Sequence, residues 1–152
     1  MRKRLMLGTL GALVGAVLGA VAWAAVTAST GYQIGYVAVA VGFLAGYGMR
    51  TLGGGRDRAD GVIAAVVALF GCVLGDLLTA VAQFAPHDAM HRSVAELALL
   101  VLLTPKIAWF MLHETFNVMD LVFYAIAVYA AYRTALKPAP AQPAPVPPAR
   151  AQ

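Results

Sequence analysis

The sequence predicts an all-α integral membrane protein: a bundle of four transmembrane helices with one further interfacial or re-entrant helix. Hydrophobic residues make up 61% of the 152 residues, against about 45–50% in an ordinary soluble domain. Charged residues make up only 12%, which is about half the usual share. The apolar residues form long runs with basic residues at their ends, and so short a chain has little interior to bury them. We therefore expect lipid to surround the chain.

The first apolar run covers residues 5–28 and follows Arg2, Lys3 and Arg4. It exceeds the roughly 20 residues that cross a hydrocarbon core. A cleaved signal peptide is the alternative, because residues 25–28 (Ala-Val-Thr-Ala) resemble a cleavage site. The hydrophobic segment of a signal peptide is about 7–15 residues long, so we expect this run to be retained as a span.

The second run, GYQIGYVAVAVGFLAGYGMR at residues 31–50, has small residues three or four apart and tyrosines near both ends. It predicts a close-packed helix around which the other runs are organised. The turn at residues 29–31 is so short that the first two spans should form an antiparallel hairpin. A charged, glycine-rich loop at 51–60 leads to a third span at 61–84, and a fourth span is expected at 116–136.

The segment at 94–112 is long enough to cross a membrane, but Pro105 should kink or break it. A fifth span would place Arg133 and Lys137 on the outer side, against the distribution of positive charge. We expect a kinked interfacial or partly re-entrant helix on the outer face, with a fifth span as the alternative.

The last residues, 138–152, read PAPAQPAPVPPARAQ and have no apolar periodicity. This composition predicts a disordered, polyproline-like tail in the cytoplasm. The chain therefore divides into a transmembrane helical domain at 1–137 and a tail at 138–152.

The positions of Lys and Arg predict the orientation. Nine of the 11 lie on one side of the predicted bundle, and only Arg92 and Lys106 lie on the other. The positive-inside rule then places both termini and the 51–60 loop in the cytoplasm. Aromatic residues should mark the two interfaces. We expect Trp23, Tyr32, Tyr36 and Trp109 at the outer interface and Tyr47 and Tyr132 at the inner one.

Small residues at four-residue steps are the strongest mechanistic signal in the sequence. Such stripes let helix backbones approach closely where lipid removes the usual hydrophobic drive. The candidate helix-packing residues are Gly11, Gly15, Gly19, Gly35, Gly42, Gly46, Gly71 and Gly75. The stripes predict either packing within the bundle or, through a stripe left over, a homo-oligomer or a partner membrane protein.

Asp76 is the acidic residue that lies well inside a predicted span. A carboxylate in hydrocarbon costs about 2.5–3.5 kcal/mol on insertion scales, so it should face the bundle interior or water. One interpretation is a proton or cation site. The other is a hydrogen bond between helices, made to Thr79, a tyrosine hydroxyl or the backbone.

Several polar residues gather on the predicted outer face: His87, Asp88, His91, His113 and Glu114. His87 and His91 are four residues apart, but they lack the His-Glu-x-x-His pattern of zinc peptidases. The run Gly53–Gly55 lacks the Lys-Ser/Thr of a phosphate loop, and Cys72 has no second cysteine to pair with. We therefore expect no catalytic residue, metal site, cofactor or nucleic-acid partner.

A family resemblance follows from three blocks of sequence. Residues 30–35 (TGYQIG) with the VGFLAGYGMR ending, residues 70–76 (FGCVLGD) and residues 119–129 (MDLVFYAIAVY) resemble an uncharacterised family of small bacterial multi-pass inner-membrane proteins. The resemblance spans about 10–133 and is weakest at 84–115. It implies four helices in a bacterial inner membrane and a polar residue, commonly Asn, near position 76. It implies no activity.

Two classes of function follow. The first is a non-enzymatic structural or accessory subunit that packs or oligomerises through its glycine stripes or recruits partners with its tail. The second is a small channel or transporter that uses Asp76. An enzyme built on the outer His, Asp and Glu residues comes third.

Overall fold

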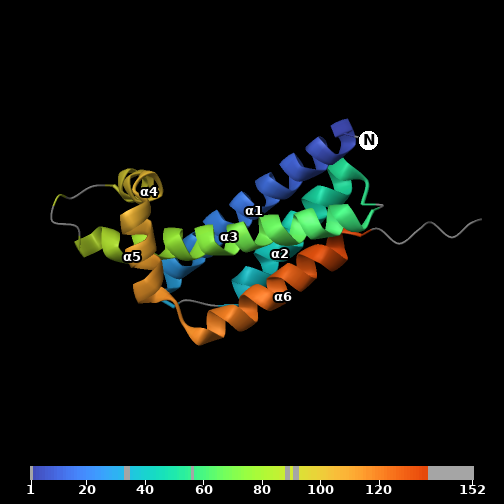
Figure 1. Cartoon of the computed structure of the whole chain (residues 1–152). Coiled ribbons are helices and arrows are strands. Elements are labelled where there is room, and N and C mark those ends of the chain that lie inside the picture. Colours follow the sequence, from blue (N-terminus) through green and yellow to red (C-terminus); the bar gives the residue numbers. More distant parts are fainter. Residues whose placement is uncertain (1, 33–34, 56, 88–89, 91–92, 137–152) are drawn as a thin grey trace, which may run out of the picture.

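The computed structural model describes residues 2–32, 35–55, 57–87, 90 and 93–136, and within these ranges the chain forms helices and no strand. Four long helices lie side by side as a bundle, and two short ones stand across one of its ends (Figure 1). The elements are α1 (Arg2–Thr30), α2 (Tyr36–Gly53), α3 (Arg58–Phe84), the 3-10 turn η1 (Ala85–His87), α4 (Val94–Leu103), α5 (Pro105–Thr115) and α6 (Val118–Ala135). The predicted all-helical class is confirmed. The predicted tail lies outside the described residues.

The two central helices of the bundle are α2 and α3. Each of them contacts the other and also packs against both α1 and α6. The helices α1 and α3 run in one direction and α2 and α6 in the other (Figure 1). The chain therefore forms two antiparallel pairs, α1 with α2 and α3 with α6.

Three helices of the described chain are long and apolar enough to cross a membrane: α1, α3 continued through η1, and α6. The bent pair α4 and α5 is a fourth candidate if it counts as one span. The predicted second span, 31–50, is not in this set, because its helix begins only at Tyr36 and contains four glycines and Arg50. Since three neighbouring helices cover α2, it needs less apolar surface than a helix facing lipid.

Local capping sets the helix ends and shortens the predicted 51–60 loop. Helix α2 continues to Gly53 and stops at Gly54, whose left-handed φ of 90° suits a residue without a side chain. Helix α3 then begins with a capping box. The Asp57 side chain accepts a hydrogen bond from the backbone N–H of Asp60, and the Asp60 side chain accepts one from the backbone N–H of Asp57. The same box opens α4 with Ser93 and Glu96, and α6 with Asn117 and Asp120.

The predicted kink in the 94–112 segment is confirmed. Its two helices, α4 and α5, meet at 107° across Thr104. Pro105 is the first residue of α5, where its missing N–H costs no helical hydrogen bond. A straight fifth span is therefore not formed. We call residues 94–115 the elbow; it packs against α3 and stands across the end of the bundle (Figure 1).

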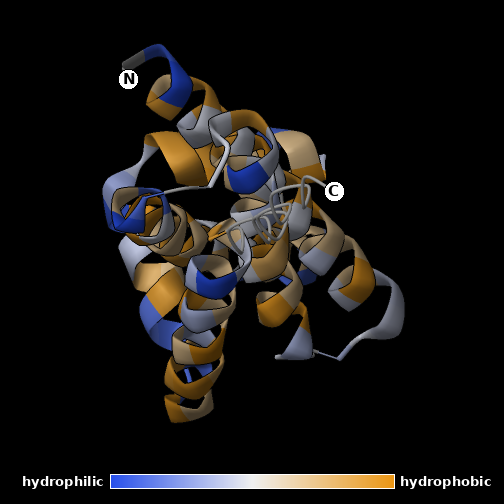
Figure 2. Cartoon of the chain, turned by 90° about the vertical axis from the view of Figure 1, so that its right-hand side faces the viewer, coloured by the Kyte–Doolittle hydropathy of each residue, from blue (hydrophilic) through white to orange (hydrophobic). Residues whose placement is uncertain are grey.

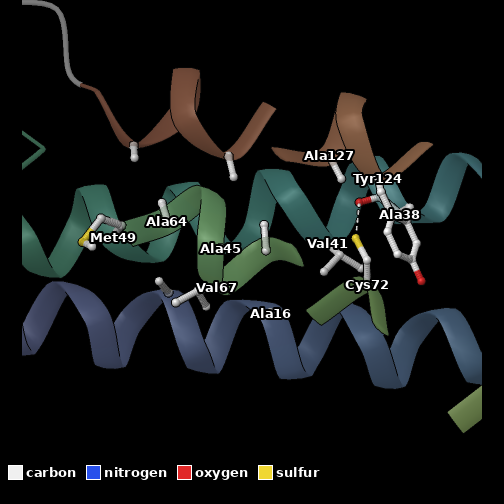
Figure 3. Packing of buried hydrophobic residues seen from close by; sticks show 14 of the residues in the cluster. Ala16, Ala38, Val41, Ala45, Met49, Ala64, Val67, Cys72, Tyr124 and Ala127 are labelled. Atoms are coloured by element: carbon white, nitrogen blue, oxygen red, sulfur yellow. Dashed lines mark hydrogen bonds between the residues drawn. The ribbon is translucent and has the colours of Figure 1, made fainter. Parts of the chain in front are cut away.

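Two groups of buried apolar residues hold the fold together. The first, which we call the bundle cluster, joins α1, α2, α3 and α6 and consists mostly of alanines (Figure 3). Its larger members are Trp23, Val41, Met49, Val67 and Tyr124. The second, the elbow cluster, consists of Leu77, Val81, Leu97 and Val101 and joins α3 to α4.

Candidate functional site

The glycines of α1 bring its backbone against α2. A Cβ atom on Gly19 would lie 2.8 Å from the Cα of Val41, and one on Gly15 would collide with the Leu44 carbonyl oxygen. Gly11 meets the backbone of α2 in the same way. Backbone atoms cannot move aside as a flexible side chain can, so these positions require glycine.

The glycines of α2 face α6. A Cβ atom on Gly46 would lie 2.5 Å from the carbonyl oxygen of Ala131, and one on Gly42 would collide with the backbone of Ala127. Gly35 lies just before α2, and a Cβ there would overlap the ring of Phe123. The helix α2 is thus in close contact with α1 on one side and α6 on another.

The glycines of α3 face α1 and α2. A Cβ atom on Gly71 would lie 2.7 Å from Val41 and 2.9 Å from Ala16, and one on Gly75 would lie 2.6 Å from the ring of Trp23. All eight predicted packing glycines therefore lie at contacts within this chain. Each helical glycine of the described residues meets another helix of the same chain, which leaves no free glycine stripe on those helices.

Trp23 corrects one prediction. We expected it at the outer interface of the membrane, but it is 1% exposed and its ring lies over Gly75. The absence of a side chain at Gly75 makes room for the indole inside the bundle. The other three predicted outer aromatics, Tyr32, Tyr36 and Trp109, are more than 70% exposed.

Asp76 lies in the interior of the bundle and is 2% exposed. Its Oδ2 accepts a hydrogen bond from the hydroxyl of Tyr124 on α6. This agrees with the predicted bond between helices and selects a tyrosine as the partner. One turn earlier on α3, the thiol of Cys72 lies 3.9 Å from the carbonyl oxygen of Ala38 on α2 (Figure 3). These two contacts join α3 to α6 and to α2.

Other buried polar atoms lie in the same part of the bundle. Trp23 Nε1, Thr27 Oγ1 and Thr79 Oγ1 are buried and have no hydrogen-bond partner among the described residues. Thr27 is one helical turn beyond Trp23, and Thr79 is one turn beyond Gly75, which Trp23 contacts. We call Trp23, Thr27, Asp76, Thr79 and Tyr124 the polar layer. It lies toward the end of the bundle that the elbow crosses.

At the other end of the bundle lies a charged cluster that the sequence analysis did not predict. Arg4 Nη2 on α1 lies 3.1 Å from Asp57 Oδ2 and 3.5 Å from Asp60 Oδ2, at the start of α3. Asp60 is 1% exposed, so Arg4 stabilises a carboxylate that is out of contact with solvent. The Asp-x-x-Asp spacing before an apolar run does signal a capping box, but nothing local in the sequence pairs it with Arg4.

The predicted outer polar residues do not converge. His87, His113 and Glu114 are exposed, and His91 and Asp88 lie outside the described residues. In the part of the chain that the structure describes, no group of three or more His, Cys, Asp or Glu side chains could hold a metal ion. A half-open groove of about 430 Å³ lies beside His113, and its other lining residues are Trp109, Leu112 and Phe116.

Comparison of the chain with protein-family models, with curated proteins and with solved structures gave no match in any of the three. The geometry of the bundle is therefore the basis for the function proposed below.

Proposed function

We propose that this chain is a four-span protein of a bacterial inner membrane that serves as a non-enzymatic structural or accessory subunit. One observation carries the proposal: the helix backbones touch through glycine, and the centre between them is filled. Val41, Ala45, Met49 and Ala64 are 0% exposed. Close packing of this kind gives a rigid body. In the half of the bundle away from the elbow, it leaves no path for water or ions along the bundle axis.

The four spans are α1, α2, α3 and α6. The helices α1, α3 and α6 have the length and hydropathy for crossing, and α2 lies among them along the bundle (Figure 1). Its 18 residues extend for about 27 Å, close to the roughly 30 Å of a hydrocarbon core. We infer that α2 crosses with its neighbours, which hide its glycines from lipid.

The charge of one end supports the orientation. Lys3, Arg4, Arg50, Arg58 and Arg133 lie at the start of α1, the end of α2, the start of α3 and the end of α6. These four helix ends gather at one end of the bundle (Figure 1), and hydrophilic segments mark it in the end-on view of Figure 2. By the positive-inside rule this end faces the cytoplasm, together with both termini.

The elbow then lies at the outer interface. Apart from the side chains that pack against α3, its apolar side chains are exposed, with Leu103 at 73% and Trp109 at 71%. Lys106, His113 and Glu114 are exposed on α5. A short helix with apolar and polar surface suits the boundary between head groups and acyl chains.

A subunit of this type works by association, either with copies of itself or with another membrane protein. Because the glycine stripes are used inside the chain, the partner must meet the outward surface of the helices or of the elbow. The test is the mass of the assembly after extraction from its native membrane in nanodiscs, measured by native mass spectrometry. A complex of defined stoichiometry supports the proposal, and a bare monomer across extraction conditions contradicts it.

A second candidate function is a small proton or cation transporter that uses the polar layer. A buried carboxylate beside unpartnered Trp23, Thr27 and Thr79 atoms favours it. The bundle cluster separates this layer from the buried Asp60 at the other end, so such a path would have to leave the bundle axis. Proton and cation flux into liposomes should be compared for the unaltered chain and Asp76→Asn. Flux that requires Asp76 favours transport, and equal flux in the two proteins removes this candidate.

A further inference from the structure

We propose that the groove between the ends of α2 and α6 binds an anionic phospholipid, with the phosphate of its head group at Arg50. The groove has a volume of about 460 Å³ and is lined by Phe43, Tyr47, Arg50, Thr51, Gly54 and Thr134. It opens at the charged end of the bundle. The inference requires that the bundle lies in a membrane and holds whichever face is cytoplasmic.

The charge of Arg50 is the first argument. Arg4 and Arg50 both lie near the turn between α2 and α3, and their surroundings differ. Arg4 contacts the carboxylates of Asp57 and Asp60. Arg50 is half-buried, and its side chain contacts no carboxylate within the described ranges. A guanidinium binds phosphate with two parallel hydrogen bonds, so Arg50 is suited to an anion from outside the chain.

The C-terminal end of α2 offsets only part of the positive charge of Arg50. Arg50 lies in the last turn of α2, where the partial negative charge of the helix end favours a cation. That charge is about half an elementary unit, so a net positive charge remains in the groove.

The shape of the groove is the second argument. Phe43 and Tyr47 precede Arg50 on α2 by about two turns and one turn, and their rings stack with centroids 6.2 Å apart and planes at 15°. The two residues are 53% and 52% exposed, so they present an apolar wall outside the bundle. This wall leads from Arg50 toward the middle of the membrane. A molecule with a phosphate at one end and an acyl chain at the other matches both parts, whereas free phosphate matches only one.

A second groove provides an internal comparison. It lies between α3 and α6, has a volume of about 390 Å³ and is lined by aliphatic and tyrosine side chains with no cation among them. Lipid held there should not be selected by head-group charge. A preference for anionic lipid would therefore report on the Arg50 groove.

The test measures lipid retained by the full chain in mild detergent, using native mass spectrometry. Phosphatidylglycerol, phosphatidylcholine and inorganic phosphate are added separately at equal concentration. Arg50→Gln should lower phosphatidylglycerol retention about fivefold, the value expected for one basic residue near an anionic head group. Arg133→Gln is the matched control, because Arg133 lies in the last turn of α6, is exposed and does not line the groove. It should leave retention within about twofold.

Three results would overturn the proposal: equal retention by the two variants, equal retention of both lipids by the unaltered chain, or displacement of phosphatidylglycerol by inorganic phosphate. If Arg50→Gln does not fold, Phe43→Ala decides, since an exposed ring can be removed without opening the core. Reduced phosphatidylglycerol retention in Phe43→Ala supports the site, and unchanged retention contradicts it.

Discussion

The bundle cluster and the elbow cluster share helix α3, which contributes mostly small side chains to the first and larger ones to the second. Where α3 faces α1, α2 and α6 it presents Ala64, Ala68 and Gly71, and the helices touch through their backbones. Where it faces the elbow it presents Leu77 and Val81 to Leu97 and Val101. One helix therefore supports two kinds of contact, one dependent on backbone proximity and the other on side-chain volume.

This difference predicts how each contact responds to change. Backbone contact leaves no rotamer to adjust, so an added methyl group must separate two helices. A contact between branched side chains can repack after the loss of a few carbons, and lipid or solvent can fill part of the space. An enlarged side chain should therefore destabilise the bundle, and a shortened side chain should loosen the contact between the elbow and α3.

The largest effect is expected from overfilling the bundle. Gly42→Leu would drive a side chain into the backbone of Ala127, and Gly15→Leu would do the same to Leu44. We expect each to destabilise the folded chain by more than ~3 kcal/mol, measured by denaturant titration in detergent with circular dichroism. Ala40→Leu and Ala22→Leu are the controls, because they place a leucine at exposed positions of the same helices. Unfolding midpoints equal to those of the controls would refute close packing at these sites.

Truncation in the elbow cluster should have a smaller and local effect. Leu97→Ala should cost about 2 kcal/mol, at the low end for a buried leucine because the cluster has few layers. Hydrogen exchange followed by mass spectrometry should show faster exchange in α4 and α5 with α1 and α2 unchanged. Leu99→Ala, at a position 59% exposed, is the matched control. Faster exchange throughout the bundle would mean that the two clusters are not separate units.

The polar contact in the bundle cluster should rank next. Tyr124→Phe removes the hydroxyl that donates to Asp76 while keeping the buried ring. We expect a loss of about 1–2 kcal/mol, the usual cost of leaving a buried acceptor without one donor. Tyr129→Phe serves as the control, since Tyr129 is 63% exposed on the same helix. If both variants unfold at the same denaturant concentration, the bond to Asp76 contributes nothing measurable.

The smallest effect is expected at the charged end of the bundle, where the start of α1 meets the start of α3. Arg4→Gln removes the ion pairs to Asp57 and Asp60, and because the Arg4 side chain is 38% exposed we expect a cost of about 1 kcal/mol. The loss should shrink as salt is added, because Asp57 is exposed and its attraction is screened. Lys3→Gln removes the same charge from an exposed neighbour, and the two variants should differ at low salt. Identical stabilities would show that the cluster does not hold α1 to α3.

The features that sequence reasoning identified correctly are local ones. A long apolar run predicts a helix wherever it packs, and Pro105 breaks the chain through its own ring and its missing N–H. The buried position of Asp76 also follows locally, because a carboxylate within an apolar run must avoid lipid. Helix ends were less well placed, since the capping boxes at Asp57, Ser93 and Asn117 had not been recognised as start signals.

The sequence by itself determined that this chain is helical, that most of its long helices can lie in a membrane and that glycines bring them together. Only the tertiary structure decided which helix each glycine meets, and it placed Trp23 inside and paired Asp76 with Tyr124, 48 residues away. A stripe of glycines has the same pattern whichever partner it faces. The choice is made by complementary surfaces on two helices at once, and this complementarity is not present in any single segment.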